Sequence, residues 1–200
     1  DGDLARLTGR AGPRGELIDG LADYGGHLVL YGALGVILSH QIGGWGWVLA
    51  VAAAASRIVQ AIHYETQRRQ YRFMVYGTPW LGSASEGRNA IADMYRTLGH
   101  LLVPRSRDAS TWFAAIAHTP CRPLAADRVF AAYRPLLRSS ALLGANMRTL
   151  ALGASMIAGS PLYYVVYEML LLNAVLVRSI LHCRQVHVAM LDTLPRLATA

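Results

Sequence analysis

Four long apolar stretches constrain the fold of this 200-residue chain more than any other feature. They cover residues 21–39, 45–62, 141–158 and 162–180. Each is close in length to the helix of about 20 residues that crosses the hydrocarbon core of a bilayer. Gly43 and Gly44 separate the first two stretches, and Gly159-Ser160-Pro161 separates the last two, as turn residues do. The pattern predicts two helical hairpins in an all-α transmembrane bundle.

The composition of the chain favours a membrane environment. Hydrophobic residues make up 54% of it and charged residues 16%, whereas about 25% of a typical soluble domain is charged. The net charge is +7, but the arginines are neither gathered in one run nor interleaved with aromatic residues, so nucleic-acid binding is not expected. Cys121 and Cys183 form no CxxC pair, which argues against a disulfide framework or a structural zinc site.

The distribution of arginine predicts the orientation of the bundle. Ten arginines lie in residues 63–137 and three in residues 1–20, but none lies in the two turns. By the positive-inside rule, the N-terminal segment, the region 63–137 and the C-terminal tail face the cytoplasm. We therefore expect a multi-pass protein of a bacterial inner membrane, with its active site at the cytoplasmic face.

The long region between the two hairpins is expected to be helical as well. We expect a single membrane-embedded domain, residues 1–200, that carries a cytoplasmic helical insertion, residues 63–137. Apolar residues recur at helical spacing between 85 and 103, opposite charged ones, and predict an amphipathic helix. Residues 125–137 predict a second short helix that ends near Pro135.

Two charges inside the apolar stretches need an explanation. Arg148 lies in the third stretch and Glu168 in the fourth, and because a buried arginine needs a partner we favour a structural ion pair between them. A site for a substrate phosphate at Arg148 is the alternative. Arg178 lies near the cytoplasmic end of the fourth stretch, where it can snorkel or contact an anionic substrate. Three histidines show no metal-ligand pattern and are interpreted as interfacial or solvated: His63, His182 and His187.

The first 23 residues hold the candidate chemistry, in the spacing D-G-x2-A-R-x8-G-x3-D-x3-D. Asp19 and Asp23 are four residues apart and project from one face of a helix. Residues 9–13 (GRAGP) are a plausible return that brings Asp1 opposite them. Three carboxylates at a membrane boundary repel one another, and a divalent cation would neutralise them. Oxygen ligands favour magnesium, manganese or calcium over zinc.

A cation beside an arginine suits a pyrophosphate group. The metal would screen the phosphate oxygens while the guanidinium of Arg6 forks onto them. Gly2, Ala5 and Gly15 are small, which lets a nucleotide approach the backbone closely. An aspartate not fully occupied by metal could accept the proton of an attacking hydroxyl. The plainer interpretation is that these acidic residues are ordinary interfacial charges that flank a membrane helix.

These seven residues resemble the signature of the CDP-alcohol phosphotransferase family, D-x2-D-G-x2-A-R-x8-G-x3-D-x3-D. The positions that match are Asp1, Gly2, Ala5, Arg6, Gly15, Asp19 and Asp23. The signature covers 23 residues directly, and the family's first aspartate would fall three residues before Asp1. We therefore expect this chain to show four spans of a six-span fold.

The resemblance implies an enzyme of phospholipid biosynthesis that uses two divalent cations, Mg²⁺ or Mn²⁺. The implied metal ligands are Asp1, Asp19 and Asp23, together with the aspartate that precedes them. Asp23 would also be the general base. The CDP group would be held by Gly2, Ala5, Arg6 and Gly15. The acceptor hydroxyl would attack the phosphorus that bears the donor's alcohol, and CMP would leave. The implied partners are a CDP-alcohol donor, an alcohol or lipid acceptor, membrane lipids and a second copy of the chain.

The substrate pair and the class of function leave alternatives open. Residues 13–17 (PRGEL) resemble choline and ethanolamine phosphotransferases, whereas residues 19–23 (DGLAD) resemble phosphatidylserine synthases. The other classes of function are a transporter or channel with an acidic membrane site, and a non-catalytic membrane scaffold. A transporter would be expected to distribute its acidic residues through the spans, but here they gather at one membrane face.

Overall fold

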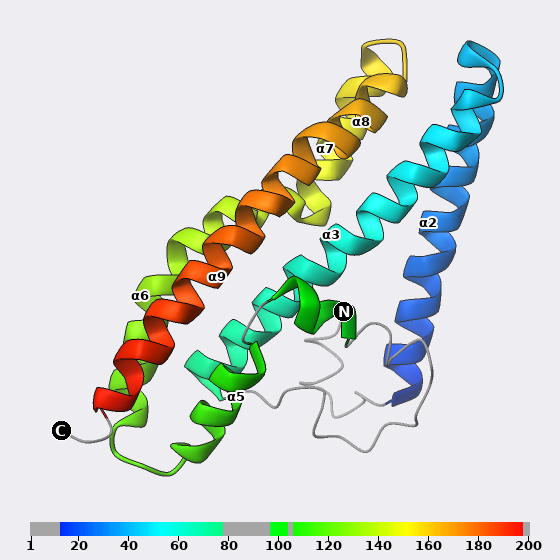
Figure 1. Cartoon of the computed structure of the whole chain (residues 1–200). Helices are drawn as coiled ribbons and strands as arrows, with labels where there is room; N and C mark the ends of the chain where they lie inside the picture. Colours follow the sequence, from blue (N-terminus) through cyan, green and yellow to red (C-terminus); the bar gives the residue numbers. More distant parts are fainter. Residues whose placement is uncertain (1–12, 78–96, 104–105, 198–200) are drawn as a thin grey trace. The chain divides into compact units, whose positions relative to one another are not determined.

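The computed structural model describes residues 13–77, 97–103 and 106–197, and every regular element in these ranges is a helix (Figure 1). The elements are α2 (Pro13–Ile42), α3 (Trp45–Tyr76), α5 (Ser106–Ala115), α6 (Arg122–Ser140), the 3-10 helix η1 (Ala141–Leu143), α7 (Ala145–Ile157), α8 (Leu162–Val166), the π-helix η2 (Tyr167–Leu171) and α9 (Leu172–Leu197). The last three follow one another without a break. The predicted all-α class is confirmed.

The chain groups into two compact units, Asp1–Ala55 and Ser56–Ala200, which divide within α3. The predictions of a single domain and of a cytoplasmic insertion at 63–137 stay predictions. Within the predicted amphipathic segment 85–103, the structure describes residues 97–103 and finds 97–102 helical.

The first unit contains a tight helical hairpin, in which α2 is followed by the beginning of α3. Gly43 turns the chain with a φ of 66°, a conformation that glycine adopts without steric cost. The backbone N–H of Gly46 donates to the Gly43 carbonyl oxygen at 2.9 Å. A Cβ at Gly46 would lie 2.3 Å from the backbone nitrogen of Ser39, so only glycine allows this approach. The turn predicted at 43–44 is confirmed.

Among the helices that the structure describes, two have the length and apolar character needed to cross a bilayer, α3 and the continuous helix Leu162–Asp192. Only 28% and 33% of their apolar windows are buried inside the protein, so most of this apolar surface faces outward. Such a surface is typical of contact with lipid or another protein. By these criteria the structure gives weak support to a membrane protein.

The predicted third span, 141–158, is not a single membrane-length helix. It consists of η1 and α7, which are separated at Gly144, where the backbone is extended. The 13 residues of α7 rise only about 20 Å, less than the hydrocarbon core of about 30 Å. The four-span arrangement therefore stays a prediction.

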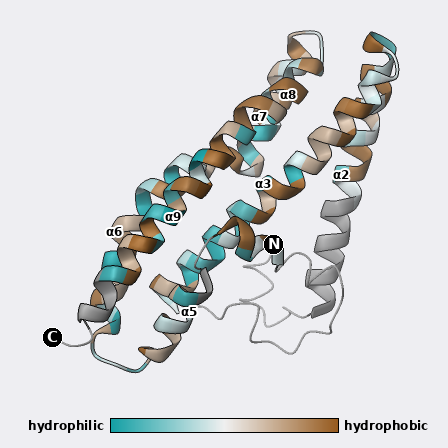
Figure 2. Ribbon diagram, in the orientation of Figure 1, coloured by the Kyte–Doolittle hydropathy of each residue, from teal (hydrophilic) through white to brown (hydrophobic). Residues whose placement is uncertain are grey.

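The core of the second unit lies where α6 and α9 run side by side (Figure 1). Its largest cluster of buried side chains includes Met74, Val103, Phe113, Val129, Tyr133, Leu136, Cys183 and Met190. Figure 2 shows that hydrophobic residues prevail at the α7–α8 end of this unit and hydrophilic ones are more frequent toward α5 and the first turns of α6.

Helix α6 continues past Pro135, so the predicted end at this proline is wrong. Pro135 lacks the N–H that would bond the preceding turn, yet α6 continues to Ser140. Leu136 and Ser140 are fully buried beyond the proline, and the Ser140 hydroxyl donates to the Leu136 carbonyl oxygen at 3.0 Å. Packing of this last turn outweighs the lost backbone hydrogen bond.

Candidate functional site

Three residues of the candidate catalytic motif lie on α2. Gly15, Asp19 and Asp23 are spaced four residues apart along a continuous helix, so their positions share one face. Asp1, Gly2, Ala5 and Arg6 lie outside the described residues, and the side chains of Asp19 and Asp23 are likewise not described. The structure thus gives the helical register of three of the seven motif residues, and the full assembly of the motif stays a prediction.

The metal prediction concerns residues whose side chains are not described. Among the side chains that the structure does describe, no group of three or more histidine, cysteine, aspartate or glutamate residues could hold a metal ion. The register of α2 sets two carboxylate-bearing residues, Asp19 and Asp23, one turn apart. Carboxylate oxygens are ligands that hard cations such as Mg²⁺ and Mn²⁺ prefer.

A line of buried polar residues runs along α3 and faces α9 in the second unit. We call it the polar seam, and on α3 it consists of Ser56, Gln60, His63, Gln67 and Gln70. The spacing alternates between four and three residues, as in the contact positions of packed helices. Four of these five side chains are fully buried. Sequence reasoning missed the seam, although the alternating spacing was visible.

The ion pair predicted inside the apolar stretches is present at one end of the polar seam. Arg148 and Glu168 are 3% and 0% exposed, and the Arg148 Nη1 group donates to the Glu168 carboxylate. Arg148 also donates from Nη2 to Gln60 Oε1 at 2.6 Å and from Nε to the Leu143 carbonyl oxygen at 3.2 Å. The guanidinium is engaged on three sides, which supports the structural interpretation over a substrate-phosphate site.

The π-helix η2 contributes to the same network. Glu168 lies in η2, where the chain is wound more widely than in an α-helix. The Gln60 side-chain amide donates to the Glu168 carbonyl oxygen at 3.2 Å and to Asn173 Oδ1 at 2.7 Å. Asn173 in turn donates to the Ser56 hydroxyl at 3.1 Å. One end of the seam therefore joins α3, α7, η2 and α9 through charged and amide groups.

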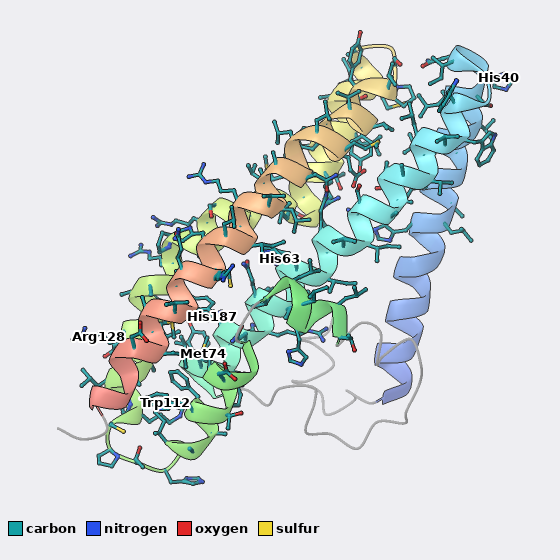
Figure 3. The ribbon with its side chains drawn as sticks, viewed as in Figure 1. His40, His63, Met74, Trp112, Arg128 and His187 are labelled. Carbon is teal, nitrogen blue, oxygen red and sulfur yellow. The ribbon has the colours of Figure 1, made fainter. Side chains whose placement is uncertain are left out.

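His63 forms the middle of the polar seam and is fully buried, so its interpretation as solvated is wrong (Figure 3). Its Nδ1 lies 2.9 Å from the Leu102 carbonyl oxygen, which can only accept, so Nδ1 carries the proton. Its Nε2 therefore accepts a hydrogen bond from the Ser179 hydroxyl at 2.9 Å. The Ser179 oxygen in turn accepts from the Gln67 side-chain amide at 3.1 Å. A directed chain of hydrogen bonds therefore runs from Gln67 through Ser179 and His63 to Leu102.

A second buried histidine lies where α6 meets α9 (Figure 3). His187 is fully buried, contrary to its interpretation as solvated, and its Nε2 shares a hydrogen bond with the Tyr133 hydroxyl. The Cys183 sulfur lies 3.7 Å from His187 Nδ1. Tyr133 lies on α6, outside the two candidate spans, and burial raises its pKa well above the ordinary value, with a smaller contribution from Cys183.

The described residues also line an open groove along one face of α9, with a volume of about 780 Å³. The lining residues are Asn173, Ala174, Val177, Arg178, Leu181, His182 and Gln185. They form adjacent pairs that recur every four positions, which places them on one side of the helix. Asn173 belongs to both the groove and the polar seam.

Comparison with protein-family models, with curated proteins and with solved structures finds no match to this chain. Its function is therefore inferred from its own residues.

Proposed function

We propose that this chain is the catalytic part of a membrane-embedded, metal-dependent CDP-alcohol phosphotransferase. The observation that carries the proposal is the set of seven residues in the spacing D-G-x2-A-R-x8-G-x3-D-x3-D. The register of α2 is consistent with it, because Gly15, Asp19 and Asp23 share one helical face. Pro13 begins this helix, at a position where proline is favoured because its missing N–H is not needed.

In the proposed reaction, each motif residue has a distinct task. Arg6 would bind the pyrophosphate of the donor, and Gly2, Ala5 and Gly15 would leave room for the cytidine nucleotide. Asp1, Asp19 and Asp23 would hold two divalent cations, which when bound screen the phosphate oxygens and polarise the phosphorus.

Asp23 would also take the proton of the acceptor hydroxyl as its oxygen forms a bond to the donor's phosphorus. The bond from that phosphorus to the bridging oxygen of CMP would break, and CMP would leave with the electron pair. The products are CMP and a phosphodiester of the two alcohols.

The proposed setting is a bacterial inner membrane that the chain crosses several times, with the motif on the cytoplasmic side. The two apolar helices and the absence of arginine from the turns at 40–44 and 159–161 support it. We also propose a homodimer, as the resemblance implies. Gly32 on α2 leaves open space where a Cβ would lie, which suits close packing against another helix.

The buried polar groups of the second unit do not favour the transporter alternative. Arg148 and Glu168 bond to each other, and Gln60 and His63 bond to neighbouring side chains and carbonyl oxygens. Networks of this kind hold membrane helices together.

The test is the variant Asp23→Asn, compared with Asp127→Asn, which changes an exposed aspartate on α6. Loss of the general base should lower the rate of CMP release by about 100-fold or more, because positioned acid–base groups contribute that much. Binding of Mn²⁺, followed by electron paramagnetic resonance, should be unchanged in Asp127→Asn and should weaken without being lost in Asp23→Asn, because Asp1 and Asp19 remain as ligands. Unchanged CMP release by Asp23→Asn would rule out the proposed role of Asp23. Absence of CMP release from the wild-type protein would contradict the enzyme itself.

A further inference from the structure

The groove along α9 combines two chemically different linings. Ala174, Val177 and Leu181 give it an apolar stretch, and Arg178 and His182 give it a basic pair one turn apart. It is a shallow groove of about 780 Å³ that is open to the surface along one exposed face of the helix. The proposed catalytic motif lies elsewhere in the sequence and does not use these residues.

No acidic side chain that the structure describes forms an ion pair with Arg178 or His182. The groove lining contains no acidic residue. The ion pairs between described side chains join Arg69 to Glu65 and Arg148 to Glu168, and neither involves the groove. A guanidinium with an adjacent imidazole and amide is well suited to a phosphate group, because its N–H donors match the phosphate oxygens in pairs.

The lining also has two sides. The apolar lining residues Ala174, Val177 and Leu181 lie in one row, within the helix Leu162–Asp192 that has the length and apolar character to cross a membrane. Arg178, His182 and Gln185 lie in the neighbouring row, each about one turn from the next and at the same levels of the helix. An elongated molecule in the groove would therefore meet apolar contacts along one side and a positive charge along the other.

The opposite face of α9 holds the groove in place. Ser179 and Cys183 are buried on that face, and the Ser179 hydroxyl bonds to His63 and Gln67 of the polar seam. Arg178 and His182 are their immediate neighbours in sequence and project to the other side of the helix. The groove face is thus presented on a helix whose rotation is fixed by buried hydrogen bonds.

We propose that this groove binds an anionic phospholipid. The phosphate lies against Arg178, His182 and Gln185, and an acyl chain runs along Ala174, Val177 and Leu181. The charge complementarity of the basic pair selects a net negative headgroup over a zwitterionic one. This lipid site is separate from the proposed phosphotransferase chemistry and does not depend on it.

Native mass spectrometry of the full-length protein in detergent tests the proposal, with phosphatidylglycerol and phosphatidylcholine of identical acyl chains as probes. We expect a one-to-one complex with phosphatidylglycerol that forms at lower lipid concentration than the phosphatidylcholine complex. The double variant Arg178→Gln with His182→Gln should raise the Kd for phosphatidylglycerol by about tenfold or more, the effect of losing a charge-assisted hydrogen bond. Circular dichroism and the Tm should show that this variant is folded.

Arg184→Gln is the matched control, because Arg184 is exposed on the same helix but does not line the groove. We expect it to leave the Kd unchanged. An equal loss of affinity for phosphatidylglycerol in Arg184→Gln, or equal binding of both lipids, would overturn the proposed site. The attraction between protein and lipid would then not depend on the groove. Glycerol 3-phosphate should not displace the lipid, and full displacement would show that the groove takes a soluble phosphate instead. These readouts do not require CMP release, so the lipid site and the proposed enzyme can fail separately.

Discussion

At the scale of single residues, the ion pair between Arg148 and Glu168 has the largest expected effect on stability. Transfer of two charges out of water costs several kcal/mol per ion, and the contacts to Gln60 and Leu143 help to offset it. The balance between these terms makes the two members of the pair depend strongly on each other.

Glu168→Ala should therefore destabilise the protein by about 3–5 kcal/mol, because it leaves the Arg148 charge buried and unpaired. The double variant Arg148→Met with Glu168→Leu should recover most of that loss. Reversible unfolding in mixed micelles measures both. A double variant that is less stable than Glu168→Ala would show that the ion pair contributes more to the free energy of unfolding than the neutralisation of its two charges.

Tyr133 predicts a pH dependence of stability. Its pKa is raised in the folded protein, so folding favours the neutral phenol. The resulting stability is fully present below the unfolded pKa of about 10 and is lost as the pH rises above that value. The Tm should fall more steeply between pH 9 and 11 in the wild type than in Tyr133→Phe. Parallel pH profiles would contradict the assignment.

The sequence was informative about Arg148 and Glu168 because isolated charges in apolar stretches require a partner. It was not informative about His63 and His187, because histidine is common both at interfaces and in buried networks. Their burial depends on which residues of other elements lie opposite, such as Ser179 for His63 and Tyr133 for His187. Local spacing does not encode those contacts.

At the scale of elements, the hairpin of α2 and α3 depends on glycine at a specific position. Gly46 contacts the backbone of Ser39 and Leu38, whereas an added Cβ at Gly25 would meet nothing within 4 Å. Gly46→Ala should cost about 1–3 kcal/mol through overpacking. Gly25→Ala should be neutral or stabilise α2 by up to about 1 kcal/mol. Thermal unfolding of the two variants, in parallel with the wild type, measures the difference. Equal Tm values would contradict the observed close approach.

Turns were the elements best predicted from sequence. Gly43 and Gly159 have φ angles of 66° and 90°, and both lie where the sequence indicated a turn. Helix ends next to proline were less predictable, because the packing of Leu136 and Ser140 carries α6 past Pro135. The helical spacing of the candidate catalytic residues on α2 was predicted from the sequence. The assembly of these residues with Asp1 and Arg6 lies outside the described residues.

At the scale of the whole molecule, the proposed enzyme is an integral membrane protein. Two of the described helices have outward-facing apolar surface, and apolar helices that cross a bilayer do not leave it for water at any pH. The full-length protein should remain in the membrane pellet after extraction with alkaline carbonate and should be released by detergent. A matched peripheral membrane protein should be released by carbonate alone. Release of this protein by carbonate would show that it lies on the membrane surface.

The central claim is the transfer chemistry, and CMP release tests it most directly. The full-length protein in nanodiscs would be supplied with Mg²⁺ or Mn²⁺ and with CDP-choline, CDP-ethanolamine or CDP-diacylglycerol, each with a panel of acceptor alcohols. We expect CMP to be released from one donor, in a reaction that depends on its acceptor and is abolished by a chelator. No CMP from any donor, in protein shown to be folded and to bind Mn²⁺, would contradict the enzyme and leave the motif as a binding site.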